Sequence, residues 1–120
     1  MSVIIAMLAV TATCVPSDSP KLTKLETAAS FFDAFNKGDQ AAMGSLIKPG
    51  ARMVMGPGDT LELAGLLSNI PAGARLEVKD MTLDDAGNVV VRTRGSDGTD
   101  ATGLIKLEGG CIVELAHQQH

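Results

Sequence analysis

The sequence contains no Trp, no Tyr and only two Cys among its 120 residues. Two cysteines exclude a disulfide framework and the paired ligand spacing of a structural metal site, so we expect no metal. The formal net charge is −4 without any basic run, whereas a nucleic-acid surface needs clustered Lys and Arg. We therefore expect no nucleic-acid partner, and no motif predicts a cofactor. The length is that of one domain, and 45% of the residues are hydrophobic.

The chain begins with an uncharged apolar run from Met1 to Thr13. This run is shorter than the roughly 20 apolar residues that span a bilayer, but it has the length of a signal-peptide core. The polar segment that follows contains two prolines and is typical of a tether. We therefore predict a leader and tether over residues 1–20, a domain over residues 21–120, and export to the bacterial periplasm or cell envelope.

Two cleavage positions fit such a leader. The segment Thr11-Ala12-Thr13-Cys14 resembles a bacterial lipoprotein box, with Thr where Leu is usual, and would place a lipid anchor on Cys14 as the chain's contact with a membrane. Cleavage after Ala12 is the alternative. A misplaced start codon that truncates the signal, or an N-terminal segment retained in the fold, also stays open.

The first helix is predicted over residues 21–39 and holds all three Phe of the chain. Ser19-Pro20 can begin it, as an N-cap followed by proline at the first helical position. The capping box Thr23-x-x-Glu26 is a competing start one turn later. Gly38 is predicted to end the helix.

Two shorter helices are predicted next. Asp39 caps a second helix that runs to Ile47, and Pro49-Gly50 stops it. A third helix begins at Asp59 or Thr60 and carries leucines at helical spacing up to Ile70.

Strands separated by glycine-bearing turns make up the rest of the prediction. They cover residues 52–55, 76–83, 89–94, 102–107 and 111–117. Helices come before most of the strands without βαβ alternation, so we predict an α+β fold in which three helices pack on one side of a curved antiparallel sheet. Alternation in the last strand predicts that Cys111, Val113, Leu115 and His117 share the inward face.

The strand over residues 76–83 leaves two alternatives open. Strict alternation would turn Asp80 inward together with Leu76 and Val78. A bulge near Lys79 would instead turn Met81 and Leu83 inward.

Four segments, "AFNKGD", "KPGARMVMGPG", "DAGNVVVRTRG" and "LIKLEGGCIVELAH", occur in the order and spacing of a known superfamily. With them the chain resembles the nuclear transport factor 2-like (NTF2-like) superfamily, nearest to its SnoaL-like polyketide cyclases and ketosteroid isomerases. The resemblance covers about residues 22–117. It implies a cystatin-like cone with an apolar pocket between helices and sheet, and often homodimers formed through the outer face of the sheet. The residues expected at the pocket are Phe31, Phe35, Met53, Met55, Gly103, Val113, Leu115 and His117.

The resemblance does not extend to the isomerase chemistry. The positions that carry a hydrogen-bonding Tyr, a carboxylate base and a carboxylic acid in ketosteroid isomerases correspond here to Phe31, about Met55 and about Gly103. None of these residues can transfer a proton or donate a hydrogen bond to an oxyanion. His117 is the one candidate for a general base, and a strand-end histidine near solvent without a chemical role is the competing interpretation. Cys111 is expected to pack as a small hydrophobic residue.

Two hypotheses on function follow. The first is an exported, non-catalytic domain that binds a small apolar ligand or a protein partner. The second is a SnoaL-like isomerase, cyclase or hydrolase that uses His117. The second requires a carboxylate beside His117 in the pocket, whereas the first requires only an apolar cavity.

Overall fold

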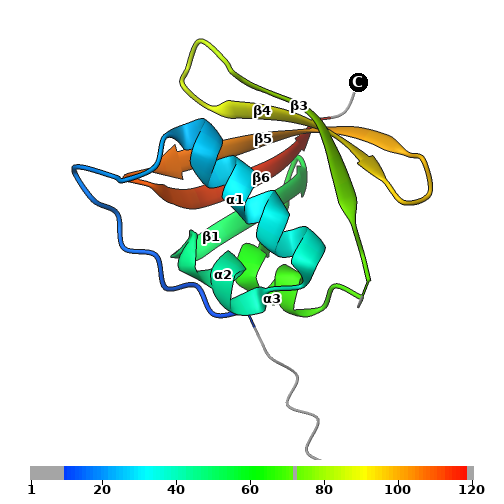
Figure 1. Cartoon of the computed structure of the whole chain (residues 1–120), viewed down its shortest axis with the longest axis horizontal. Coiled ribbons are helices and arrows are strands. Elements are labelled where there is room, and N and C mark those ends of the chain that lie inside the picture. The colour runs from blue at the N-terminus through cyan, green and yellow to red at the C-terminus, as the bar shows by residue number, and fades with distance from the viewer. Residues whose placement is uncertain (1–9, 72, 119–120) are drawn as a thin grey trace, which may run out of the picture.

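The computed structural model describes residues 10–71 and 73–118, and Figure 1 shows its elements. The helices are α1 Lys24–Lys37, α2 Gln40–Ser45 and α3 Leu63–Ser68. The strands are β1 Ile47–Gly56, β2 Asp59–Glu62, β3 Leu76–Leu83, β4 Val89–Gly95, β5 Asp100–Glu108 and β6 Cys111–Gln118.

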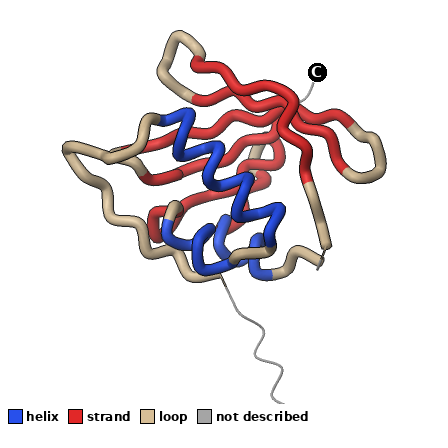
Figure 2. The backbone as a smooth tube through the Cα atoms, in the orientation of Figure 1, coloured by secondary structure: helices blue, strands red, loops and turns tan. Residues whose placement is uncertain are grey.

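The strands form one six-stranded sheet in the order β2-β1-β6-β5-β4-β3. Its pairs are antiparallel except for β1 and β6, which run parallel. The helices lie against one face of this sheet, with α1 crossing it diagonally (Figure 2). The predicted α+β class, with helices packed on a mostly antiparallel sheet, is confirmed.

Helix α1 begins at the later of its two predicted starts. The Glu26 backbone N–H donates to Thr23 Oγ1 at 3.1 Å, and the Thr23 N–H donates to Glu26 Oε1 at 2.9 Å, which completes the capping box. Gly38 ends the helix with φ 67°, a conformation that favours glycine. The start at Ser19-Pro20 is therefore wrong. Phe31, 2% exposed, meets Phe32 edge-to-face with the ring centroids 5.4 Å apart.

The second helix is shorter and the first strand longer than predicted. Asp39 caps α2 as expected, but the helix stops at Ser45 and Ile47 already belongs to β1. Ile47 pairs with Ile112 of β6, and the pairing resumes only at Arg52 with Glu114. Pro49 and Gly50 lie in this irregular stretch, where a missing ladder donor and a positive φ are tolerated.

Strand β2 was not predicted. It forms an antiparallel hairpin with β1 over Asp59–Glu62, residues that the sequence assigned to the start of the third helix. Helix α3 consequently begins at Leu63 without a side-chain cap.

The ambiguity in β3 is resolved by a bulge. The register with β4 shifts between Val78 and Asp80, so that Lys79 is the extra residue. Met81 packs against the core, while Asp80 is exposed and paired with Arg92. The alternative in which Met81 turns inward is therefore right, although Leu83 remains 51% exposed.

A second bulge corrects the predicted inward face of β6. Lys106 pairs with Glu114 and Leu107 with Ile112, which leaves Val113 unpaired. The extra residue shifts the alternation by one position, so Ile112 is 0% exposed in the core while Leu115 and His117 keep the inward face. Val113 lies instead beside Pro49–Arg52, and its predicted place at the pocket is wrong.

The segment 10–17, which we call the N-terminal strap, packs against the domain. The Thr13 N–H donates to the Gly44 carbonyl, the Cys14 N–H to the Ile47 carbonyl and the Ser17 N–H to the Gly109 carbonyl, at 2.9–3.0 Å. Val10 is 5% exposed and belongs to the hydrophobic core. The structure therefore places the strap with the domain that was predicted to begin at residue 21, while residues 1–9 of the predicted leader lie outside the described residues.

A disulfide joins the strap to β6. Cys14 and Cys111 are bonded across a sequence separation of 97 residues, with 5.7 Å between their Cα atoms. Cys111 is 0% exposed, as expected for a small hydrophobic residue, but it is not a free thiol. A lipid thioether on Cys14 would need the same sulfur atom, so the predicted lipidation is incompatible with this bond. None of the described helices is long and apolar enough to cross a membrane.

Candidate functional site

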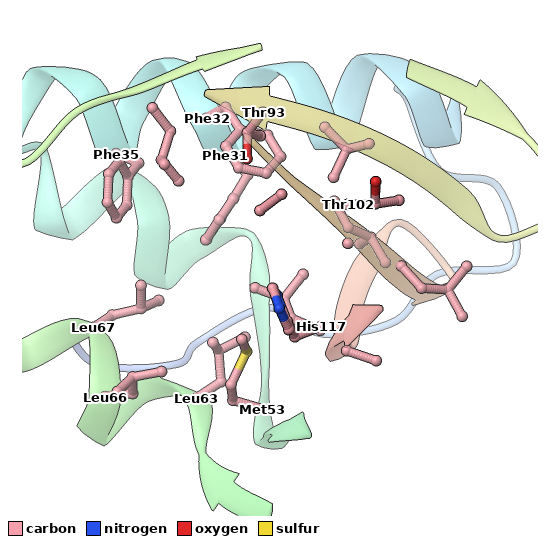
Figure 3. A pocket seen from close by; sticks show the side chains of 18 of the residues that line it. Phe31, Phe32, Phe35, Met53, Leu63, Leu66, Leu67, Thr93, Thr102 and His117 are labelled. Atoms are coloured by element: carbon pink, nitrogen blue, oxygen red, sulfur yellow. The ribbon is translucent and has the colours of Figure 1, made fainter. Parts of the chain in front are cut away.

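A cavity of about 240 Å³ lies between α1, α3 and the inner face of the sheet (Figure 3). Helix α1 contributes aromatic side chains and α3 contributes leucines, because both helices turn their apolar faces to the sheet. The floor comes from the inward positions of β1, β4, β5 and β6. The lining residues include Phe31, Phe32, Phe35, Met53, Leu63, Leu66, Leu67, Ile70, Leu76, Val91, Thr93, Gly103, Ile105, Leu115 and His117.

Gly103 leaves space at the centre of the floor. It pairs with Val91 on one side and with His117 on the other, both at inward positions. A Cβ built on Gly103 would meet Val91 Cγ1 and the Ala116 carbonyl oxygen at 3.5 Å, an ordinary van der Waals distance. A larger side chain here would therefore fit the strand and project into the cavity.

The structure brings together most of the residues that the sequence expected at the pocket. Those that line the cavity are Phe31, Phe35, Met53, Gly103, Leu115 and His117. Val113 is turned away by the β6 bulge. Met55 lies at the register shift where β1 meets the turn to β2, is 39% exposed, and does not line the cavity, so its predicted position is wrong.

Two parts of the cavity wall were not predicted from the sequence. The leucines of α3 were recognised as a helix face but were not placed at the pocket. Thr93 was missed as well, although the alternation of Val89, Val91 and Thr93 in β4 was available as a signal.

The wall of the cavity is almost entirely apolar. Among the described residues that line it, the polar side chains are those of Thr93, Thr102 and His117, and no Asp, Glu, Lys, Arg or Tyr is present. Figure 3 shows these three side chains among carbon-only neighbours and the Met53 sulfur. Such a surface can bind an apolar molecule, but it offers few groups that could stabilise developing charge.

His117 lies at the rim of the cavity. It follows Leu115 on the inward face of β6 and is exposed to solvent. The β3 bulge leaves Asp80 on the outer side of the sheet, and no carboxylate is among the described lining residues. The arrangement of base and orienting carboxylate that the enzyme hypothesis requires is therefore not formed.

The perturbed carboxylates lie on the surface, away from the cavity. Arg94 Nε donates to Asp100 Oδ1 at 2.8 Å and holds the pKa of Asp100 below its usual range. The Thr99 backbone N–H lowers the pKa of Asp97 in the adjacent turn. In the part of the chain that the structure describes, no three His, Cys, Asp or Glu side chains come together as a metal site.

Comparison with known proteins identifies the fold. No protein-family model and no curated protein sequence matches the chain. Among solved structures, an uncharacterised cystatin-fold protein from Novosphingobium aromaticivorans superposes with a TM-score of 0.69 at 20% identity, covering 82% of this chain and 99% of that one. An NTF2-like protein of unknown function from Cytophaga hutchinsonii gives 0.68 at 18% identity, covering 83% and 92%. This chain has the NTF2-like fold.

The same comparison includes a protein named for an activity. IdmH from Streptomyces antibioticus, named as a proposed polyketide cyclase, superposes with a TM-score of 0.63 at 21% identity, covering 81% of this chain and 91% of that one. At such identity the NTF2-like fold is shared, whereas chemistry depends on the residues of each site.

Proposed function

We propose that this NTF2-like domain binds a small apolar ligand in the cavity between α1, α3 and the sheet and does not catalyse a reaction on it. The apolar wall, without any charged side chain among the described lining residues, is the observation that carries the proposal. Burial of apolar surface supplies the affinity, and the aromatic side chains of α1 provide a rigid contact surface.

The cavity volume limits the ligand. At the packing density of a protein interior, about 0.75, a cavity of 240 Å³ holds roughly 180 Å³ of ligand atoms. A bicyclic hydrocarbon such as indane fits within this volume, whereas a steroid does not. The modest size predicts weak binding, with a Kd of about 0.1 to 1 mM for indane, because small ligands yield limited free energy per atom.

Filling the cavity tests the proposal. Gly103→Leu should place a side chain in the space that the ligand needs and abolish indane binding, measured by isothermal titration calorimetry. Thr82→Leu, at an exposed position of β3, is the matched control and should bind like the wild type. Far-UV circular dichroism checks that both variants are folded. Wild-type protein that shows no heat of binding, or a Gly103→Leu variant that binds unchanged, would refute the proposed site.

Catalysis with His117 as general base is the alternative, favoured by the place of this residue at the rim. It predicts turnover of β,γ-unsaturated ketones or polyketide-like esters that His117→Ala abolishes. Under our proposal neither protein turns these compounds over, and His117→Ala changes affinity only modestly. Robust wild-type turnover that is lost in the variant would decide for the enzyme.

We also propose that the protein is exported. The pairing of Cys14 with Cys111 supports this, because disulfides persist in oxidising compartments. The strap must then remain in the mature chain, which argues against cleavage after Ala12 or before Cys14. Fractionation of the host and the intact mass of the purified protein test both points. A cytosolic protein, or a mature chain that begins at Thr13 or Cys14, would contradict the proposal.

We propose that the chain pairs with a second copy of itself, in a homodimer formed through the outer face of the sheet. Four apolar residues at aligned outward positions form a row across β1, β6, β5 and β4, which we call the outer apolar row: Val54, Ala116, Leu104 and Val90. All are half-buried, and none belongs to the core cluster or packs against it. A twofold contact between two such rows would remove them from water.

A further inference from the structure

The hydroxyl of Thr93 is a buried polar group that the fold leaves unused. Thr93 is 7% exposed, and the other buried polar residue, Thr27, donates its hydroxyl to the Thr23 carbonyl at 2.9 Å. Within the described residues the Thr93 side chain has no such hydrogen bond. No fully buried side-chain N or O atom of those residues lacks a partner, so Thr93 Oγ1 must retain some exposed surface, and Thr93 is one of the residues that line the cavity.

The cross-strand neighbours of Thr93 on the inner face offer its hydroxyl no side-chain partner. On the inner face of the sheet Thr93 pairs with Val78 of β3 and Ala101 of β5, whose side chains carry no polar atoms. Buried hydroxyls in proteins are normally hydrogen-bonded, because a lost hydrogen bond to water is otherwise uncompensated. Thr93 lines the cavity, from which a bound ligand can reach its hydroxyl, and it also borders a small surface pocket beside Arg92 and Asp100.

We infer that the ligand is a neutral molecule with an apolar body and one hydrogen-bonding oxygen, a ketone or an alcohol, that pairs with Thr93 Oγ1. A threonine hydroxyl can donate to a carbonyl oxygen or accept from an alcohol. A carboxylate is disfavoured, because no described lining residue carries a fixed positive charge to offset its burial. This inference rests on the proposed binding function and names the chemistry of its ligand.

A matched pair of probes tests it. Indane and 1-indanone share one bicyclic skeleton and differ by the carbonyl oxygen. Thr93→Val keeps the branched shape that suits a strand and removes only the hydroxyl. We expect Thr93→Val to lower the affinity for 1-indanone by about 3- to 10-fold, which is the effect of one neutral hydrogen bond. The affinity for indane should change by less than about 2-fold. Thr93→Ser, which retains the hydroxyl, should keep the preference of the wild type for the ketone.

Each result of this experiment is informative. Equal effects of Thr93→Val on both probes would overturn the inference and leave the binding function standing, as would a wild type that binds both probes equally well. Failure of both probes to bind the wild type would refute the binding function and the inference with it. Circular dichroism checks the fold. If Thr93→Val does not fold, Thr93→Ala removes the same hydroxyl, and the ratio of the two affinities gives the same decision.

Discussion

The disulfide between Cys14 and Cys111 should supply a large share of the stability of this domain. It closes a loop with a sequence separation of 97 residues, and the chain-entropy relation gives about 4.7 kcal/mol at 25 °C for a loop of that length. Domains of this size have a free energy of unfolding of about 5–15 kcal/mol. We therefore expect replacement of both cysteines to lower the free energy of unfolding by about 3–5 kcal/mol, because measured effects often fall below the entropic value.

The design of the variant follows from burial. Cys111 is 0% exposed, so a serine would add a buried hydroxyl that needs a partner, and alanine at both positions is the cleaner replacement. Urea unfolding must be followed by far-UV circular dichroism, because the chain has no Trp or Tyr. With an m-value of about 1–3 kcal/mol/M, we expect the urea midpoint to fall by roughly 1–5 M.

Reduction provides an independent route to the same state. A phosphine reductant should bring the wild type to the stability of the double-alanine variant and should leave the variant itself unchanged. Coincident midpoints for oxidised wild type and variant would refute the loop-closure reasoning. Two maleimide-reactive thiols in denatured, unreduced wild type would show that the bond is absent in the isolated protein.

Further predictions concern the strap, the first helix and the outer face. A Cβ on Gly44 would collide with the Thr11 carbonyl oxygen, whereas one on Gly65 would meet only Glu62 Oε1 at 3.6 Å. Measured by thermal unfolding, Gly44→Ala should therefore lower the free energy of unfolding by about 1–3 kcal/mol, whereas Gly65→Ala should raise it by about 0.5–1 kcal/mol. Equal effects of the two substitutions would refute the packing of the strap. The Thr23 backbone N–H lowers the pKa of Glu26, so this carboxylate stabilises the fold above its ordinary pKa, and its contribution is lost as the pH falls below about 4. Glu26→Gln should accordingly lower the Tm at pH 7, and the difference from the wild type should shrink as the pH falls below about 4; a pH-independent difference would contradict the assignment. Leu104→Lys should convert a dimer into a monomer in light scattering, and a wild type that is monomeric throughout would end the dimer proposal.

The regular helices and strands could largely be predicted from local sequence patterns. The strand Leu76–Leu83 has its predicted bounds, because its alternation and flanking turns agree. The predictions were wrong where the pairing between strands interrupts the alternation of inward and outward side chains. In β6 one unpaired residue places Ile112 on the inner face, where strict alternation predicted Val113. Nothing in the local sequence marks that bulge, which depends on the register with β5.

The candidate site was predictable in kind but not in detail. Apolar residues at Phe31 and Gly103 indicated a pocket without isomerase groups, and the structure places both at the cavity. Thr93 was overlooked because a threonine in a valine-rich strand is unremarkable until burial and the absence of a hydrogen-bond partner in the described structure are known. Such information is tertiary, since it depends on which strands and helices surround the residue.

The N-terminal strap shows why an apolar run is ambiguous in sequence. The same small and branched residues that form a signal core can cover a helix end, and composition does not distinguish the two. The distinguishing features lie far away in the chain. Gly44 lacks the side chain that would block Thr11, and Cys111 lies 97 residues from its partner, so neither could be connected to the strap before the fold was known. The strap also joins the cavity to the disulfide, because the Val10 N–H donates to Ser68 Oγ at 2.9 Å on α3, the helix whose leucines line the cavity.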